Sequence, residues 1–238
     1  MGDVRSIFGD RDPREVPLYT IGQAARYLKV APSTVRAWTV GQDYPRAHNR
    51  TGRFKPLLHL PKGAPARLTF NNLVEAYVLT TIRRAHSVSL TKVRRAIANV
   101  VRDIGEPRPL LSHEFLTDGA NLYTQEFGEA LLEVSAPSGK QYAMRTVIGL
   151  GLKRIKRGGD GLVERFYPFR VDADEPKIVC IDPRLSFGKP TVEGTGVTVD
   201  IIADLVHAGE KPARVAREFG ISTSTVNSAV AWHRRAAA

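Results

Sequence analysis

Arginine and lysine side chains are concentrated in one part of this sequence, and their chemistry is the binding of anions. Between Pro17 and Arg102 there are 15 basic and 2 acidic residues, a net charge of +13, whereas the whole chain of 238 residues carries +11. Each phosphate that Lys or Arg neutralises releases condensed counterions, so this field favours a polyanion as partner. A solvated basic face without a ligand is the alternative.

Two short predicted helices position the first candidate contacts. In "YTIGQAARYLKV", Thr20 and Gln23 have the spacing of a capping box, and apolar residues then recur every three or four positions as far as Leu28. The segment "APS" interrupts this helix, and Ser33 is predicted to cap a second one, "TVRAWTV", which ends at Gly41. Two helices joined in this way form a helix-turn-helix, whose second helix presents its first residues to the DNA major groove.

The second helix and the segment after it carry the candidate DNA contacts. If Val35 and Trp38 point inward, Arg36 points outward and can bind a guanine edge or a phosphate. Thr34 suits a phosphate or the methyl group of thymine. In "RAHNRTGRFKPLLHL" a turn is predicted at Asn49–Gly52, and the resulting ribbon, a wing, would carry basic side chains at its tip. The full candidate set is Ser33, Thr34, Arg36, Trp38, Arg50, Arg53 and Lys55.

The sequence from "YTIGQAARYLKVAPSTVRAW" to "SVSLTKVRRAI" resembles the winged DNA-binding domain of the MerR family. Two further helices are predicted after the wing, in "LTFNNLVEAYVLTTIRRAHSVSLTKVRRAIANVVRDIG". The resemblance implies that Arg36 and Arg53 contact DNA. The chain departs from the family where Ala37 and Trp38 replace a double aromatic, and it lacks the long dimerising coiled coil of many MerR proteins, so any dimer must form elsewhere.

Residues 106–172 are predicted to form a small α+β connector in which no chemistry is visible. Strands and a turn near Asp118 and Gly119 are expected in "FLTDGANLYT" and "EALLEVSA". A helix is predicted in "QYAMRTVIGLGLKRIKR", with apolar residues spaced from Met144 to Ile155. "GGDG" would end this helix before a final strand, "LVERFYPFRV".

A second helix-turn-helix is predicted near the C-terminal end. Its expected boundaries are Asp200 to Ala208 for one helix, Pro212 and Gly220 for the next, and Ser222 or Ser224 as the cap of the third. The segments "IDPRLSFGKPTVEGTGVTV" and "AGEKPARVAREFGIS" resemble a small domain family of antitoxins encoded beside PIN-like ribonucleases. The resemblance implies a toxin partner. This sequence departs from the family at Gly196, where a basic residue is usual.

The two helix-turn-helix motifs share a pattern. "ARYLKVAPSTV", which begins at Ala25, returns 191 positions later as "AREFGISTSTV", which begins at Ala216. Only the first copy lies in the segment of charge +13, and the rest of the chain sums to −2. We therefore expect the first copy to bind DNA and the second to serve dimerisation or the toxin, with DNA as a further alternative for the second copy.

Catalytic chemistry has little support in the sequence. "FGKPT" has Pro190 where a phosphate-binding loop needs Ser or Thr. Four carboxylates between Asp172 and Asp182 would suit a metal-dependent nuclease, but three of them belong to the polar segment "VDADEP". The six His residues lack ligand spacing, and Cys180 in "KIVCID" is predicted to be a buried thiol. We expect no enzyme activity, no cofactor and no metal.

Together these patterns predict an α+β fold that is mainly helical. The expected order is a flexible lead-in (1–16), a winged helix-turn-helix DNA-binding domain (17–105), the connector (106–172), and a C-terminal trihelical helix-turn-helix domain preceded by short strands (173–238).

The two resemblances together imply an antitoxin of the VapB type. Such a protein would bind a PIN-like ribonuclease toxin and repress its own operator, double-stranded DNA, as a homodimer or a toxin–antitoxin hetero-oligomer in the cytoplasm. No apolar run approaches the roughly 20 residues that cross a membrane, so no membrane partner is expected. A stand-alone MerR-like transcriptional regulator, with an effector pocket in the connector, is the alternative.

Overall fold

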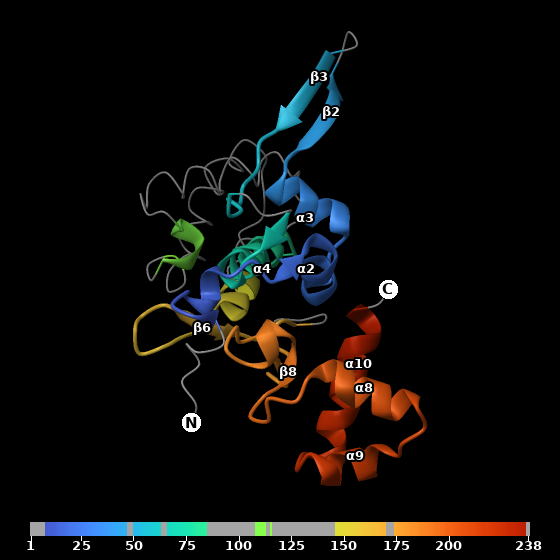
Figure 1. Cartoon of the computed structure of the whole chain (residues 1–238). Helices are drawn as coiled ribbons and strands as arrows, with labels where there is room; N and C mark the ends of the chain where they lie inside the picture. The colour runs from blue at the N-terminus through green and yellow to red at the C-terminus, as the bar shows by residue number, and fades with distance from the viewer. Residues whose placement is uncertain are drawn as a thin grey trace.

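Short helices and two-stranded antiparallel ribbons make up this chain in the computed structural model, which describes residues 8–46, 50–62, 66–84, 108–112, 115, 146–169 and 174–236. The predicted fold class, mainly helical α+β, is confirmed (Figure 1). The elements are η1 (Pro13–Glu15), β1 (Tyr19–Thr20), α2 (Ile21–Leu28), α3 (Pro32–Thr39), β2 (Gln42–Arg46), β3 (Arg50–Phe54), β4 (Arg67–Leu68), α4 (Phe70–Arg84), η2 (Pro109–Leu111), a helix over 146–152, β5 (Ile155–Arg157), β6 (Val163–Phe166), β7 (Val179–Cys180), η3 (Ser186–Gly188), β8 (Thr191–Val192), α8 (Val199–His207), α9 (Pro212–Glu218) and α10 (Thr223–Ala236).

The start of α2 confirms the predicted capping box, whereas the start of α3 differs from the prediction. Thr20 Oγ1 accepts a hydrogen bond from the Gln23 backbone N–H at 3.1 Å, and Gln23 Oε1 accepts one from the Thr20 backbone N–H at 3.0 Å. Helix α3 has Ala31 as its N-cap and Pro32 in its first turn, without a side-chain cap. Proline suits this position because it has helical φ and no N–H to satisfy, so Ser33 lies inside the helix.

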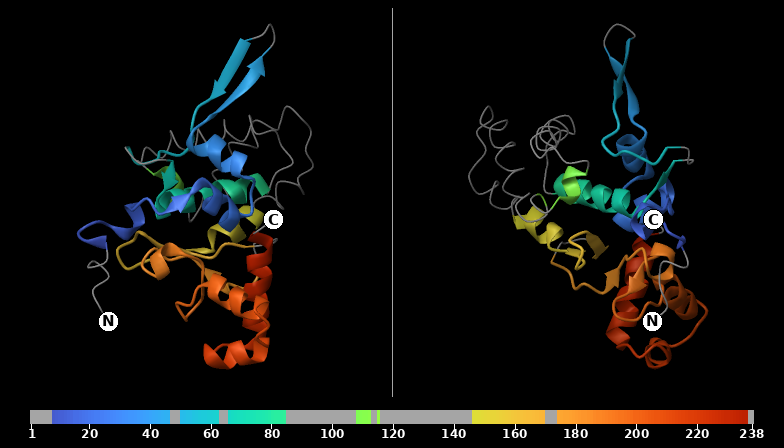
Figure 2. Two further views of the ribbon diagram at one scale, coloured as in Figure 1. Left: turned by 45° about the vertical axis from the view of Figure 1, so that its right-hand side comes forward. Right: turned by 60° about the vertical axis from the view of Figure 1, so that its left-hand side comes forward.

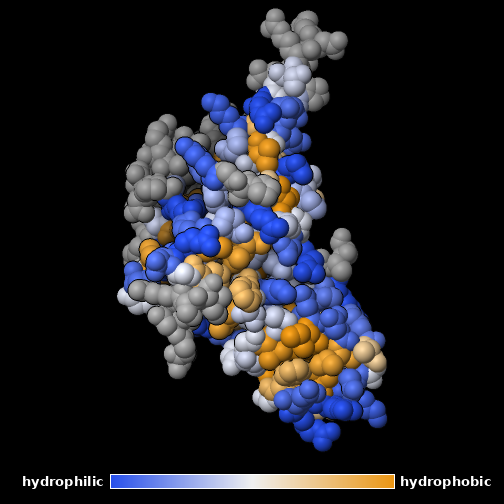
Figure 3. All heavy atoms as spheres, viewed as in Figure 1, coloured by the Kyte–Doolittle hydropathy of each residue, from blue (hydrophilic) through white to orange (hydrophobic). Residues whose placement is uncertain are grey.

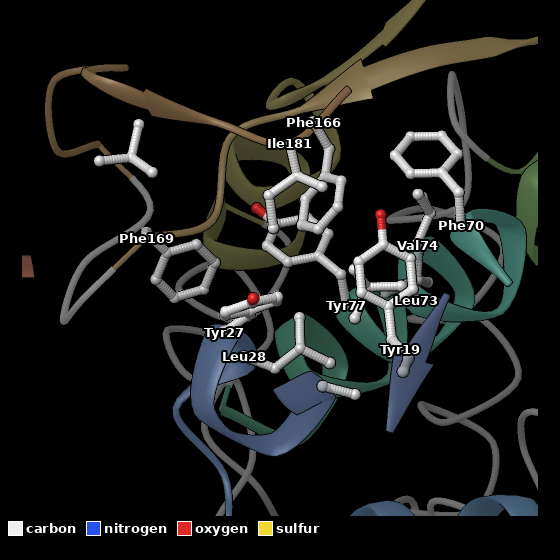
Figure 4. Packing of buried hydrophobic residues seen from close by; sticks show 14 of the residues in the cluster. Tyr19, Tyr27, Leu28, Phe70, Leu73, Val74, Tyr77, Phe166, Phe169 and Ile181 are labelled. Atoms are coloured by element: carbon white, nitrogen blue, oxygen red, sulfur yellow. The ribbon is translucent and has the colours of Figure 1, made fainter. Parts of the chain in front are cut away.

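One hydrophobic core runs through the N-terminal, middle and C-terminal parts of the described chain. Helix α4 is buried along most of its length, and its Tyr77 ring lies 5.0 Å from that of Phe166 in β6 (Figure 4). Phe166 in turn exchanges backbone hydrogen bonds of 3.1 and 2.9 Å with Ile181, which follows β7. The predicted regions therefore pack as one body, and their boundaries in the sequence stay a prediction.

In the described part of the middle region, the predicted helix ends earlier than expected. The helix ends at residue 152, Ile155 lies in strand β5, and "GGDG" joins β5 to β6 instead of ending a helix. The chain reverses at Arg154, which is 2% exposed and donates to the carbonyl oxygens of Tyr167 at 2.7 Å and Glu175 at 2.5 Å. This buried guanidinium holds the two chain segments together, and no periodicity in the sequence predicts such a contact. The final strand predicted in "LVERFYPFRV" is confirmed as β6.

Several predicted elements lie outside the described residues. They are the second helix after the wing, the strands and turn around Asp118 and Gly119, and residues 1–7 of the lead-in. Within the described part of the chain, every helix is too short or too polar to cross a membrane.

The C-terminal part follows the predicted order of two short strands and three helices. Strand β7 pairs with β8, and Thr198 caps α8 by accepting a hydrogen bond from the Ile201 N–H. Pro212 is the first residue of α9, and Ser222 Oγ accepts from the Thr225 N–H at 3.0 Å at the start of α10. Gly220 has φ +66° at the end of α9, a conformation that glycine adopts without strain.

A close approach at Gly188 joins the N-terminal motif to the C-terminal part. Tyr19 Oη donates to the Gly188 carbonyl oxygen at 3.0 Å in a buried environment. Gly188 has φ +71°, and a Cβ atom there would lie 2.1 Å from Tyr19 Oη. Glycine is therefore required here both by backbone conformation and by space.

We predict that Gly188→Ala lowers the free energy of unfolding by about 2–5 kcal/mol, because left-handed φ and a steric clash add. The matched control is Gly194→Ala, where φ is +78° but no atom lies within 4 Å of the new Cβ. This control should cost only about 1–2 kcal/mol. Equal losses for both variants in chemical denaturation would contradict the close approach.

Candidate nucleic-acid interface

The β2–β3 wing projects from the rest of the described chain, and α3 lies at its base (Figure 2). The wing pairs in antiparallel register from Gln42–Phe54 at its base to Arg46–Arg50 at its far end. After the wing, the chain returns to α3, where the Trp38 carbonyl oxygen accepts hydrogen bonds from the Leu57 and Leu58 N–H groups at 2.8 and 2.9 Å. The base of the wing is therefore tied to the C-terminal end of α3.

The side chains of α3 divide into a buried and an exposed set, as predicted for all but one candidate. Val35 is 0% exposed, whereas Ser33 and Arg36 are exposed and Thr34 is partly exposed. Trp38 is 4% exposed and belongs to the hydrophobic core. A side chain covered by the protein itself has no surface to offer a phosphate, so we leave Trp38 out of the proposed contacts.

Arg83 lies beside the recognition helix and was not among the sequence candidates. Its Nη1 atom donates to Thr34 Oγ1 at 2.8 Å, and the side chain is exposed. Arg83 comes from the last turn of α4, 49 positions further along the chain. The adjacent pair Arg83–Arg84 is visible in the sequence, but only the packing of α4 against α2 brings it to α3.

The wing residues lie differently from the prediction of a basic tip. Residues 50–52 belong to β3, so the turn predicted at Asn49–Gly52 is wrong for those three positions. Arg50 pairs with Arg46 at the far end of the ribbon, but Arg53 pairs with Asp43 near the base, and the exposed Lys55 follows the strand. Basic residues are thus spread along the length of the wing instead of being gathered at its tip.

An exposed ion pair fixes the orientation of Arg53. Its Nη1 atom lies 3.1 Å from Asp43 Oδ1, and both side chains are more than half exposed. Nη2 donates to the Val40 carbonyl oxygen at 3.3 Å. A solvent-exposed pair of this kind contributes roughly 0–1 kcal/mol, so its partner is exchangeable for a phosphate.

The turn between α2 and α3 rests on the C-terminal helix. Lys29 has φ +55° and ψ +45°, and its N–H and that of Val30 bond the last carbonyls of α2. Left-handed backbone costs a side-chain-bearing residue about 1–2 kcal/mol. The Lys29 side chain offsets this cost, because Nζ donates to the Trp232 carbonyl oxygen at 3.0 Å and lies 3.8 Å from the centroid of the Trp232 ring.

Two of the groups considered for catalysis, Asp182 and Cys180, are buried. Asp182 is 1% exposed and lies 2.7 Å from Arg184 Nη2 and 3.4 Å from Arg165 Nη2. Cys180 is buried as predicted, and burial raises the pKa of its thiol to about 12. Among the described residues, no three His, Cys, Asp or Glu side chains are grouped so that they could hold a metal ion.

Each of the two motifs matches a known family. Residues 17–97 match the family described as "Putative DNA-binding HTH domain", which covers α2, α3 and the wing. Residues 179–232 match a family described as "Protein of unknown function (DUF433)". The N-terminal motif is thus a helix-turn-helix of a DNA-binding class, in agreement with the sequence prediction.

Whole-chain relatives come from Mycobacterium tuberculosis. The chain is 29% identical over 229 residues to "Putative antitoxin VapB45", covering 91% of this chain and 93% of that protein. It is 26% identical over 233 residues to "Uncharacterized protein Rv2308", covering 93% and 91% of the two chains. The crystal structure of Rv2018 matches with a TM-score of 0.62 and 25% identity, over 90% of this chain and 97% of that one. The predicted resemblance to a VapB-type antitoxin is confirmed.

We predict that Lys29→Ala destabilises the protein more than Lys29→Gly. Both variants remove the side chain that meets Trp232, but only glycine adopts the left-handed turn without strain. Expected losses in the free energy of unfolding are about 2 kcal/mol for alanine and about 1 kcal/mol for glycine, from the strain and cation–π magnitudes. If the alanine variant were the more stable of the two, the left-handed turn at Lys29 would be contradicted.

Proposed function

We propose that this chain is an antitoxin that binds the operator DNA of its own operon through α3 and the wing. The observation that carries the DNA-binding half is the position of Arg36, which is exposed on the second helix of the motif between the buried Val35 and Ala37. A guanidinium in this position can bind the O6 and N7 atoms of guanine with two hydrogen bonds.

The other contacts divide by the chemistry that each side chain offers. Ser33 and Thr34 lie at the start of α3, where hydroxyl groups can bind phosphate oxygens, and Arg83 lies beside them. Along the wing, Arg50, Arg53 and Lys55 would neutralise the adjacent phosphates, which gives affinity and register rather than sequence preference. If the protein acts as a dimer, two-fold symmetry requires an inverted repeat with half-sites one or two turns apart, each turn roughly 34 Å.

The toxin-binding half of the proposal rests on the relative named as an antitoxin, which matches 91% of this chain, and on the surface of the C-terminal part. Figure 3 shows a hydrophobic area there, and Ile201 on α8 is 48% exposed. Exposed apolar areas rimmed by polar residues are typical of protein-binding surfaces. We propose that a PIN-like ribonuclease binds this part of the cytoplasmic antitoxin and is inhibited by occlusion, without any catalysis by the antitoxin.

A stand-alone transcriptional regulator would need an effector pocket. The described residues include a cavity of about 380 Å³ lined by Asp10 to Arg14, and one of about 180 Å³ beside Trp232, lined also by Pro168, Ile178 and Ser228. Pockets for small molecules usually have volumes of roughly 300–1,000 Å³. Between the two hypotheses, the relative named as an antitoxin favours toxin binding.

We predict that Arg36→Ala weakens binding to the chain's own promoter DNA by about 1–3 kcal/mol and relaxes the preference at one base pair. Binding is measured by fluorescence anisotropy over a series of salt concentrations. The control is Arg11→Ala, which removes an exposed arginine outside the motif. Unchanged affinity and sequence preference for Arg36→Ala would contradict its role as a base contact.

For the toxin, we predict that Ile201→Glu prevents co-purification of this chain with the proposed PIN-like toxin. The charged side chain would be buried without a partner in the complex, which costs several kcal/mol. Leu162→Glu is the control, because Leu162 is 51% exposed in the β5–β6 turn. Capture of the toxin by the Ile201 variant at the wild-type level would exclude this face of α8 as the contact.

A further inference from the structure

The two helix-turn-helix motifs are equivalent residue by residue in the structure. In the first, the Val30 N–H bonds the Ala25 carbonyl oxygen at 3.1 Å; in the second, the Ile221 N–H bonds that of Ala216 at 2.9 Å. The next bond also recurs, from position 29 to 26 and from position 220 to 217, at 3.4 Å in both motifs. Every one of these positions is related by the offset of 191 that the sequence pattern shows.

The equivalence extends to the exposed face of the second helix. Val35 and Val226 correspond, and both are 0% exposed. The position of Arg36 in α3 is occupied in α10 by Asn227, which is exposed. Asparagine is the side chain whose amide binds the N6 and N7 atoms of adenine in the major groove. The second motif therefore has, at the position equivalent to Arg36, a residue that can form hydrogen bonds with a base edge.

Positive charge is concentrated in both motifs and not only in the first. From Lys211 to the end there are five basic residues and one acidic residue, a net charge of +4. Since residues 17–102 carry +13 and the whole chain +11, the remaining residues sum to −6. The sum of −2 for everything outside 17–102 conceals this second basic segment. Its exposed members are Lys211, Arg214, Arg217 and Arg234.

The chemistry of this surface favours DNA over a protein partner. The first turns of α10 expose hydroxyl and amide groups, at Ser222, Thr223, Ser224 and Asn227. The centres of protein–protein interfaces are instead apolar and depleted of charged residues. The large exposed apolar side chains of the described C-terminal part, Phe187 in η3 and Ile201 on α8, lie outside α9 and the first turns of α10.

We propose that α9 and α10 form a second binding site for double-stranded DNA, in which Asn227 contacts a base edge and Arg214 and Arg217 contact phosphates. The wing and α9 lie at opposite ends of the molecule (Figure 1). The second site therefore contacts a DNA segment separate from the one bound by α3, and one chain can bridge two segments. This goes beyond operator binding by the first motif.

The test uses the full chain and two probes, a duplex that spans its own promoter and a mixed-sequence duplex. Arg214→Ala/Arg217→Ala is expected to weaken binding several-fold and to lower the salt slope by about 0.9 for each phosphate that is no longer neutralised. The same change is expected in an Arg36→Ala background, since the two sites are separate. Asn227→Ala is expected to reduce the preference for the promoter duplex while leaving the salt slope unchanged. Arg11→Ala, which removes an exposed arginine outside both motifs, is the control.

Thermal unfolding of each variant checks that the fold is retained, which we expect because all the substituted side chains are exposed. If Arg214→Ala/Arg217→Ala leaves affinity and salt slope unchanged while Arg36→Ala weakens binding, the second site is overturned and the proposed function stands. If only the α9 variant weakens binding, the second site is supported and α3 does not contact the DNA bases. Loss of toxin co-purification by the α9 variant, with unchanged DNA affinity, would identify a protein surface and overturn the proposal.

Discussion

The contact between Lys29 and Trp232 joins the part of the molecule that is proposed to bind DNA to the part that is proposed to bind a toxin. A left-handed residue in a helix-turn-helix turn is usually glycine, as at Gly220 in the second motif. The left-handed residue in the first motif is Lys29, and its ammonium group contacts both the ring and the carbonyl oxygen of Trp232. The angle between α2 and α3 therefore depends on the C-terminal helix.

Further contacts also join the N-terminal motif to the C-terminal part. The Tyr19 hydroxyl reaches the Gly188 carbonyl oxygen, and the Tyr27 ring lies 6.3 Å from both Tyr19 and Trp232. Because these aromatic groups are buried, separating the two parts would expose a large apolar surface to water. A rigid base of this kind lets the exposed Arg36 and the wing be held in one arrangement before DNA binds, which lowers the entropic cost of binding.

Local signals in the sequence predicted local features well. Thr20 and Gln23 form the capping box, Pro212 begins a helix, and Arg36 faces outward, because each depends on residues within one helical turn. Contacts between distant segments were not predictable, such as Arg83 on Thr34 or the buried Arg154 that ends a helix. Trp38, which was predicted both to point inward and to be among the candidate contacts, belongs to the hydrophobic core.

The central claim, that α3 lies on DNA, is tested most directly by affinity cleavage from Ser33→Cys carrying a tethered iron–EDTA group. The chain has a single native cysteine, and burial with a pKa of about 12 keeps the Cys180 thiol unreactive, so only the introduced thiol is labelled. We predict cleavage inside each operator half-site, and none from the same group on Leu162→Cys, which is exposed in the β5–β6 turn, outside the motif. Cleavage outside the half-sites, or equal cleavage from both positions, would contradict the account.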